Sequence, residues 1–157
     1  MTGGPLRRVR NGADPVPGRG SGRGRAPVPG TPGAGVNRDP AVYWPEPHLT
    51  LEPHPRTGPV LVTVSHTVPP ERQAAFVGAM RAVGRSRRRT GAMRWGLFRA
   101  GERAHVFVEV DQVRSWGEHL RQHGGRLTGA DRAVEEQARE LVDGEPVVPH
   151  LLPADPD

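Results

Sequence analysis

The 157-residue chain contains no cysteine, no lysine among its 22 basic residues, and only 4% aromatic residues. The absence of cysteine excludes disulfides, thiolate metal sites and cysteine nucleophiles. No apolar run approaches the ~18–20 residues that would span a bilayer, and residues 1–25 lack the apolar centre of a secretory signal. We therefore expect a soluble, cytoplasmic protein.

Residues 1–39 contain ten glycines, six prolines and no aromatic side chain. Such a segment cannot bury enough apolar surface to offset the entropy lost on ordering, so we expect a disordered tail. It holds seven arginines and two aspartates, and thus the whole formal charge of +5. The GRGSGRGRA stretch could lie along nucleic-acid phosphates, but no Tyr or Phe is present to stack on bases, which favours a solvated linker.

Six prolines in residues 40–59 predict an extended surface segment, with Tyr43, Trp44 and Leu49 as anchors. Residues 60–68 then alternate Val with other side chains, the pattern of a strand with one buried face, and His66 falls on the valine face.

Pro69 and Pro70 end this strand and suit the first turn of a helix. Phe76, Met80 and Val83 give that helix an apolar stripe. It closes with a basic cluster before Gly91, where the helix dipole favours cations, an explanation preferred here over nucleic-acid binding. The cluster consists of Arg85, Arg87, Arg88 and Arg89.

Residues 93–98 and 105–110 alternate as two strands of a hairpin. Ser115 with Glu118 forms a capping-box pattern for a helix that Gly124 and Gly125 should break. A further helix is predicted over residues 128–142, with Gly144 as its C-terminal stop, and a last strand over 147–152. The order strand, helix, strand, strand, helix pair, strand predicts an α+β, ferredoxin-like domain over residues 60–153.

Several segments resemble one family. WGLFR at 95–99, SWGEHLRQH at 115–123 and ADR at 130–132, with YWPEPHLTLEP at 43–53, GPVLVTVSHTV at 58–68 and VVPHLL at 147–152, cover roughly residues 40–153. They resemble the C-terminal cytoplasmic domain of major-facilitator exporters of the transmembrane secretion effector type. That domain is similar to the antibiotic biosynthesis monooxygenase superfamily of dimeric α+β barrels.

The resemblance implies a homodimer. A four-stranded sheet with helices on one side leaves its other face uncovered, and in the superfamily this face meets a second subunit. We expect the face to include Trp95 or Phe107, whichever points away from the helices.

The resemblance also implies a pocket between sheet and helices, near Trp116 with His119 or His123, and lined by Trp95, Phe107, Trp116 and Leu120. The weak catalytic candidates are His66, His119 and His123. His66 is the candidate for the strand asparagine of heme-degrading members, but Arg126 stands where those members have a later histidine, so no catalytic role carries over cleanly. A buried Trp is more often core than site.

His119 and His123, four residues apart on a helix, could share a metal ion, but no third ligand lies at a motif spacing and we expect neither a metal nor another cofactor. No nucleotide-binding fingerprint appears in a suitable context either. The sequence therefore favours a non-enzymatic accessory domain for export or secondary metabolism. It would dimerise, bind a small hydrophobic or aromatic ligand, or associate with a membrane exporter. The alternative is a cofactor-independent monooxygenase acting on an aromatic substrate or heme.

Overall fold

The computed structural model describes residues 47–155, so the tail predicted at residues 1–39 and the anchors Tyr43 and Trp44 lie outside the described residues. The elements are β1 (Val60–Thr67), η1 (Pro70–Arg72), α1 (Gln73–Thr90), β2 (Arg94–Arg99), β3 (Val106–Val113), α2 (Trp116–Arg121), η2 (Gln122–Arg126), α3 (Gly129–Arg139), β4 (Asp143–Val147) and β5 (His150–Leu151). The antiparallel sheet has the order β2-β3-β1-β4, with β5 also paired to β1. The predicted ferredoxin-like topology is confirmed.

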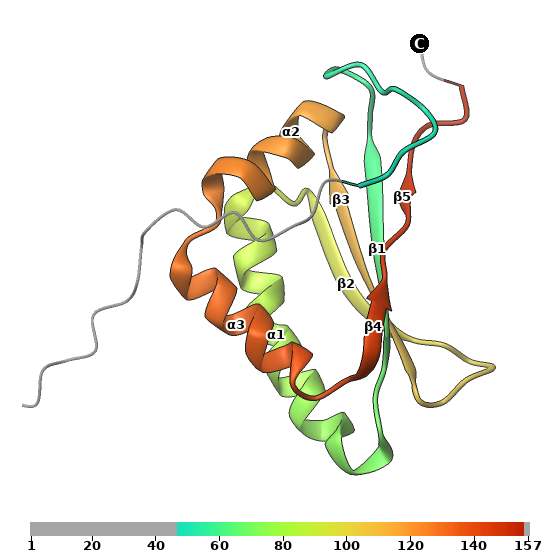
Figure 1. The fold of residues 1–157 in the computed structure, drawn as a ribbon, viewed down its shortest axis with the longest axis vertical. Coiled ribbons are helices and arrows are strands. Elements are labelled where there is room, and N and C mark those ends of the chain that lie inside the picture. The colour runs from blue at the N-terminus through green and yellow to red at the C-terminus, as the bar shows by residue number, and fades with distance from the viewer. Residues whose placement is uncertain (1–46, 156–157) are drawn as a thin grey trace, which may run out of the picture. The chain divides into compact units, whose positions relative to one another are not determined.

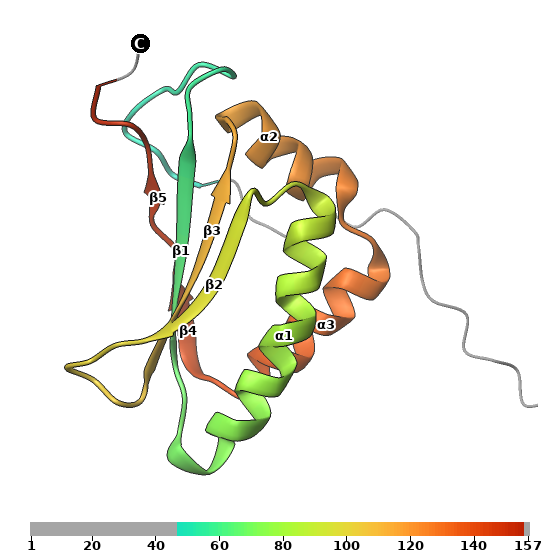
Figure 2. The ribbon, with the colours of Figure 1, turned by 180° about the vertical axis from the view of Figure 1, so that it is seen from behind.

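The helices cover one face of the sheet and leave the other open (Figures 1 and 2). Strand β1 has the predicted alternation, with Val60, Val62, Val64 and His66 buried. Helix α1 follows Pro69 and Pro70 through the short 3-10 turn η1, and it ends at Gly91, whose φ of 136° is readily adopted only by glycine.

The predicted break at Gly124 and Gly125 is wrong. The chain continues through both as the π-helical turn η2 and leaves helical geometry at Leu127. Ser115 does cap α2, since its hydroxyl accepts from the Glu118 N–H at 3.3 Å. The Glu118 carboxylate does not complete the capping box, because it accepts from Arg121 and Arg126, both at 2.6 Å.

The C-terminal part also differs from the prediction. Helix α3 ends at Arg139, before the predicted 142, and Gly144 lies within β4 with a φ of 69°. Of the strand predicted at 147–152, Val147 is the last residue of β4 and His150–Leu151 form β5, with Pro149 between them. Proline lacks the N–H that would continue the pairing, so the strand is interrupted there.

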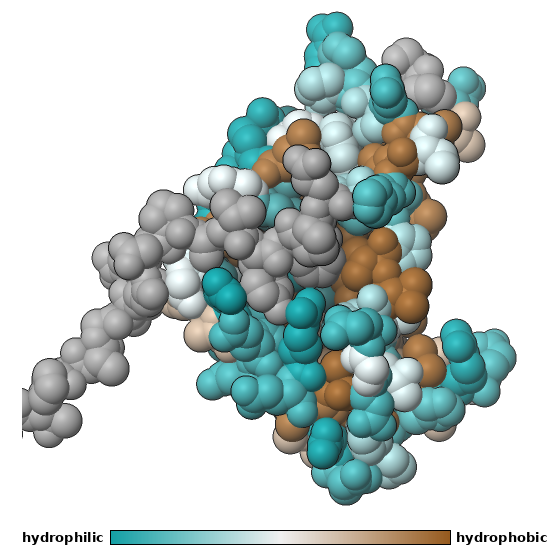
Figure 3. Space-filling view, in the orientation of Figure 1, coloured by the Kyte–Doolittle hydropathy of each residue, from teal (hydrophilic) through white to brown (hydrophobic). Residues whose placement is uncertain are grey.

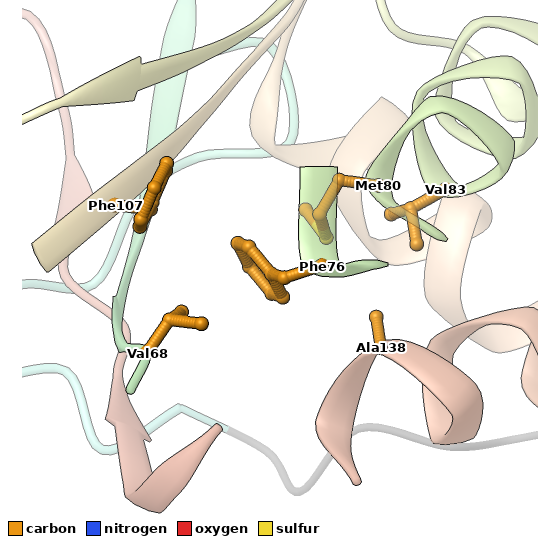
Figure 4. Close-up of a cluster of buried hydrophobic side chains, with 6 residues drawn as sticks. All are labelled: Val68, Phe76, Met80, Val83, Phe107 and Ala138. Carbon is orange, nitrogen blue, oxygen red and sulfur yellow. The ribbon is translucent and has the colours of Figure 1, made fainter. Parts of the chain in front are cut away.

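The main core cluster lies between α1, α3 and the sheet (Figure 4). Its buried members are Val68, Phe76, Met80, Val83, Phe107 and Ala138. A second cluster joins Val60, Val62 and Val113 to Trp116 on α2. These two clusters fix the helices to the inner face of the sheet.

The expectation that Trp95 or Phe107 lies on the open face is wrong. Both point toward the helices: Trp95 packs on the main cluster, and Phe107 is only 6% exposed and meets the Phe76 ring edge-on at 5.5 Å. The strand register places other apolar side chains on the opposite side, which we call the outer face. They are Leu61, Phe98, Val108, Val110, Val147 and Leu151. Apolar surface is visible on the side of the molecule formed by β1, β4 and β5 (Figure 3).

Candidate functional site

A buried ionic cluster lies between the helices and the inner face of the sheet. Arg87 of α1 is 4% exposed, and its Nε donates to Glu109 Oε1 on β3 at 3.1 Å. Its Nη1 donates to Glu135 Oε1 on α3 at 2.6 Å. Trp95 Nε1 on β2 also donates to Glu109 Oε1, at 2.8 Å. We call Arg87, Glu109, Glu135 and the nearby Asp111 the Arg87 cluster.

The positions of these groups follow from the periods of their elements. On β3, Glu109 and Asp111 alternate in step with Phe107 and Val113, which places the two carboxylates on the inner face. On α1, Arg87 is four residues after Val83 and so continues the buried stripe of the helix. A charge at each of these core positions requires a partner nearby, because an unpaired buried charge is costly.

The cluster perturbs the ionisation of its members. Burial alone would raise the pKa of Glu109, but the charge of Arg87 and the interactions with His66 and Trp95 outweigh it and bring that pKa down to about 2. Burial raises the pKa of Asp111 to about 6, although Arg87 and Gln122 oppose the shift. For Arg87, burial lowers the pKa but the surrounding carboxylates more than compensate, so the pKa lies above its ordinary value. The guanidinium is thus a permanent cation between carboxylates.

Three histidines gather beside this cluster on α2, η2 and β5. His119 is 2% exposed, and its Nε2 lies 3.1 Å from His150 Nε2, so one ring donates and the other accepts. The rings of His119 and His123 stand 4.7 Å apart, and the Trp116 ring lies 5.0 Å from His119. Burial, with the nearby positive or protonatable groups, lowers the pKa of His119 to about 4 and that of His123 to about 3. Both rings are therefore neutral at pH 7.

The space between sheet and helices is nearly filled. One cavity of about 30 Å³ is lined by His66, Arg87, Glu109 and Glu135 among others, and one of about 10 Å³ by Arg87, Glu109, Asp111 and His123 among others. Volumes of this size hold a water molecule or so. Benzene occupies an engineered cavity of roughly 150 Å³, so neither space accommodates an aromatic substrate.

A larger hollow of about 730 Å³ lies away from the Arg87 cluster, between residues 47–51 and 145–154. Its walls are mainly proline and leucine side chains, with Arg139, Glu145 and His150 contributing polar atoms. Its volume falls in the range of small-molecule sites. A small hydrophobic ligand of this chain stays a prediction.

The residues expected to form one pocket are dispersed. Trp95 and Phe107 belong to the main core cluster, Trp116 to the second, and Leu120 is 48% exposed on the far side of α2. The inner side of α2 is instead set by Trp116, His119 and Gln122, which are spaced by three residues.

The three candidate histidines do not form one cluster: His66 lies beside Glu109, whereas His119 and His123 contact each other. His66 is 8% exposed, with its Nε2 3.9 Å from Glu109 Oε2, and borders the larger of the two inner cavities. His123 borders the smaller cavity, and His119 contacts His123 and His150. Within residues 47–155, no group of three or more His, Asp or Glu side chains is arranged to hold a metal ion.

Sequence reasoning missed the Arg87 cluster and the contact of His150 with His119. Two signals were available: Glu109 and Asp111 fall in step with Phe107, and Arg87 falls in step with Met80 and Val83. A carboxylate and a guanidinium on facing core positions indicate a buried pair. The basic run around Arg87 concealed it, because its three arginine neighbours are exposed.

The fold is that of antibiotic biosynthesis monooxygenase-like proteins. It is similar to a putative antibiotic biosynthesis monooxygenase from Caulobacter crescentus, with a TM-score of 0.55, 20% identity, and coverage of 64% of this chain and 93% of that chain. It is also similar to Rv0793 from Mycobacterium tuberculosis, with a TM-score of 0.53, 20% identity, and coverage of 62% and 97%. It is similar as well to PA3566 from Pseudomonas aeruginosa, with a TM-score of 0.51, 19% identity, and coverage of 65% of this chain and 99% of that chain. At these identities the similarity establishes the fold alone.

Comparison of the sequence with family models identifies a family as well as a fold. The model of the transmembrane secretion effector family matches residues 27–156, and the chain belongs to that family. The predicted resemblance is thus confirmed. No curated protein matches the sequence. Among the helices of residues 47–155, none combines the length and the apolar character needed to cross a membrane.

Proposed function

We propose that this domain acts without catalysis, as a self-associating accessory module of an export system. One contrast between the two faces of the sheet carries the proposal. The inner face, where a substrate would lie, is occupied by the Arg87 cluster. The outer face carries exposed apolar side chains, and none of the helices of residues 47–155 lies over it (Figures 1 and 2).

Catalysis in the inner space is disfavoured by its geometry. A general acid or base must reach the reacting atom of a bound substrate, and the remaining volumes of about 30 and 10 Å³ leave no room for one. To open the space, Arg87 would have to leave two carboxylates that hold it at 3.1 and 2.6 Å. Breaking such a buried pair costs about 3–5 kcal/mol, so the closed arrangement is the stable one.

The outer face is suited to a second copy of this chain. Phe98 is 59% exposed and its ring lies against Gly96, so the ring covers the sheet surface instead of projecting from it. On the two central strands the outer positions are uncharged, so two copies can meet there without opposing like charges. These positions are Leu61, Thr63, Ser65, Thr67, Val106, Val108, Val110 and Gln112. Contiguous exposed apolar surface of this kind marks an interaction site, and a two-fold axis would make the face its own complement.

The test is the mass in solution. At tens of micromolar, light scattering of the full chain should give twice the 17.0 kDa chain mass. Phe98→Glu should give the monomer mass, because pairing would bury the new carboxylate in an apolar interface. Leu120→Glu is the matched control, since Leu120 is 48% exposed but lies on α2, away from the sheet, and it should leave the dimer intact.

A monomeric wild-type chain, or a Phe98→Glu variant that stays dimeric, would contradict self-association. The monooxygenase alternative has its own readout. Oxygen uptake with anthrone-like phenols or heme that disappears in His119→Ala, while the circular dichroism spectrum is unchanged, would replace the proposal by an enzymatic one.

A further inference from the structure

The solvent side of α1 carries a row of exposed arginines. Arg81, Arg85 and Arg88 are exposed and follow one another at spacings of four and three residues, so they line up along one side of the helix. The two other arginines of α1 are engaged: Arg87 is buried in its cluster, and Arg89 pairs with Asp131. We call Arg81, Arg85 and Arg88 the α1 arginine row.

Among residues 47–155, no carboxylate pairs with this row. Helix α1 holds five arginines and no acidic residue, and within residues 47–155 none of the three row arginines forms an ion pair. Arg88 makes a cation–π contact instead: its guanidinium carbon lies 5.3 Å from the centroid of the Trp95 ring. Residues 47–155 are nearly balanced in charge, with 15 arginines and 13 acidic residues. The row is therefore a local concentration of charge and not a reflection of a basic domain.

The helix dipole accounts for only part of the row. Its stabilisation of cations falls off within the last helical turn, and α1 ends at Thr90. Arg88 lies in that turn, but Arg85 and Arg81 lie one and two turns earlier. Three like charges on one side of a helix repel one another, so the row destabilises the isolated domain slightly. An anionic partner would remove that repulsion.

We propose that the α1 arginine row docks on an anionic lipid surface. The row offers no open aromatic ring on which a nucleic-acid base could stack: the exposed positions that continue it toward the helix start are Ala74 and Gly78, and Arg88 covers a face of Trp95. Small side chains beside arginines leave a smooth surface that can approach a planar array of phosphates. Met93, three residues after the end of the helix, is an apolar side chain that is 53% exposed.

Two further observations support a membrane as the partner. The family is described as a transmembrane secretion effector, while no helix of the described residues could cross a membrane, so contact of this domain with a bilayer would be at the surface. Helix α1 covers the inner face of the sheet, so its solvent side stays accessible when the outer face is occupied (Figure 2). The lipid-binding surface is thus separate from the proposed self-association, and either can fail without the other.

The test compares two triple variants in the full chain. Both are made in a background in which the seven arginines of residues 1–39 are glutamine, so that the tail cannot bind lipid by itself. One variant is R81Q/R85Q/R88Q, and the control is R56Q/R103Q/R114Q, which removes the same charge from three exposed arginines elsewhere in the domain. Binding is measured by co-sedimentation with vesicles of phosphatidylcholine alone or mixed with phosphatidylglycerol.

We expect the background protein to bind only the phosphatidylglycerol vesicles and to be released by salt, since the Debye length is about 10 Å at 0.1 M and shortens above it. One arginine near an anionic surface raises the partition coefficient about fivefold, so the partition coefficient of the row variant on these vesicles should be about 100-fold lower. The control should lose far less. Circular dichroism should be the same for both variants.

Three results would overturn the proposal. The first is the absence of binding to phosphatidylglycerol vesicles by the background protein. The second is an equal loss of binding in the two triple variants, which would mean that net charge matters and the row does not. The third is tight binding to duplex DNA or RNA at physiological salt without vesicle binding, which would assign the row to nucleic acid.

Discussion

Replacing Arg87 by methionine tests the buried ionic cluster most directly. Methionine keeps much of the side-chain volume but removes the cation that Glu109 and Glu135 share at 3.1 and 2.6 Å. Glu109 would keep the hydrogen bond from Trp95 and the contact of its Oε2 with His66 Nε2 at 3.9 Å. Because breaking a buried pair by removing one partner typically costs 3–5 kcal/mol, the free energy of unfolding should fall by about 3–5 kcal/mol at pH 7. With an m-value of roughly 2 kcal/mol/M, the urea midpoint should drop by about 2 M.

The pH dependence of this loss has a definite sign. In the wild type, the pKa of Glu109 is about 2 against an ordinary 4.5, so its stabilisation is present above pH 4.5 and is lost as the pH falls toward 2. Without Arg87, burial would dominate and raise the carboxylate pKa values above 4.5, so the folded variant would be stabilised by protonation. The difference between wild type and variant should therefore be larger at pH 7 than at pH 4.

Two controls complete this experiment. Arg88→Met changes the adjacent, exposed arginine and should shift stability by no more than about 0.5 kcal/mol. Adding Glu109→Gln and Glu135→Gln to Arg87→Met should recover part of the loss, because the two carboxylates that Arg87 contacts directly are then uncharged. A folded Arg87→Met variant that loses less than about 1 kcal/mol at pH 7 would refute the view that the cluster holds the inner space closed.

Two further predictions concern α1 and the histidines. Gly84→Ala should lower the free energy of unfolding by about 1–3 kcal/mol and alter tryptophan fluorescence, because the new Cβ would lie 2.6 Å from the Trp95 ring. Gly78→Ala has open space at its Cβ and should raise the free energy of unfolding by up to about 1 kcal/mol. An equal effect of both changes in urea titrations would contradict this packing. The free energy of unfolding should decline as the pH falls from 6.5 toward 4, because the folded pKa values of His119 and His123, about 4 and 3, lie below their ordinary 6.5. In His119→Gln this decline should be shallower, and an unchanged slope would show that the buried imidazole does not cause it.

The sequence alone predicted the elements in which apolar residues repeat at a regular spacing. Alternating valines located β1, and the stripe of Phe76, Met80 and Val83 located α1, in both cases close to the observed ends. Glycines were less reliable as predictors of where a helix ends. Gly124 and Gly125 were expected to end a helix, yet the chain passes through them as a π-helical turn and leaves helical geometry at Leu127, which is 1% exposed.

The face of each strand and the content of the site were harder to predict. Alternation on β2 and β3 separates two faces but does not say which one meets the helices. Trp95 and Phe107 were therefore expected in a pocket on the helix side and, for one of them, on the open face; the structure places both on the helix side. The valines Val108 and Val110 lie outside, while Glu109 and Asp111 lie inside. Burial of these carboxylates is favourable because they face Arg87, which is 22 residues away from Glu109 in sequence. The apolar repeat of one strand or helix does not indicate which distant residue will pair with it.

The Arg87 cluster has a consequence for how sequences with this fold can diverge. Loss of one member is costly, whereas joint replacement of a buried ionic group by apolar side chains of similar volume is often neutral or stabilising. Positions 87, 109 and 135 should therefore change together among relatives and seldom singly. A relative with smaller apolar residues at these three positions would have an open space under the same sheet. One concerted change would then separate relatives that bind a substrate inside from relatives, like this chain, whose interior is closed.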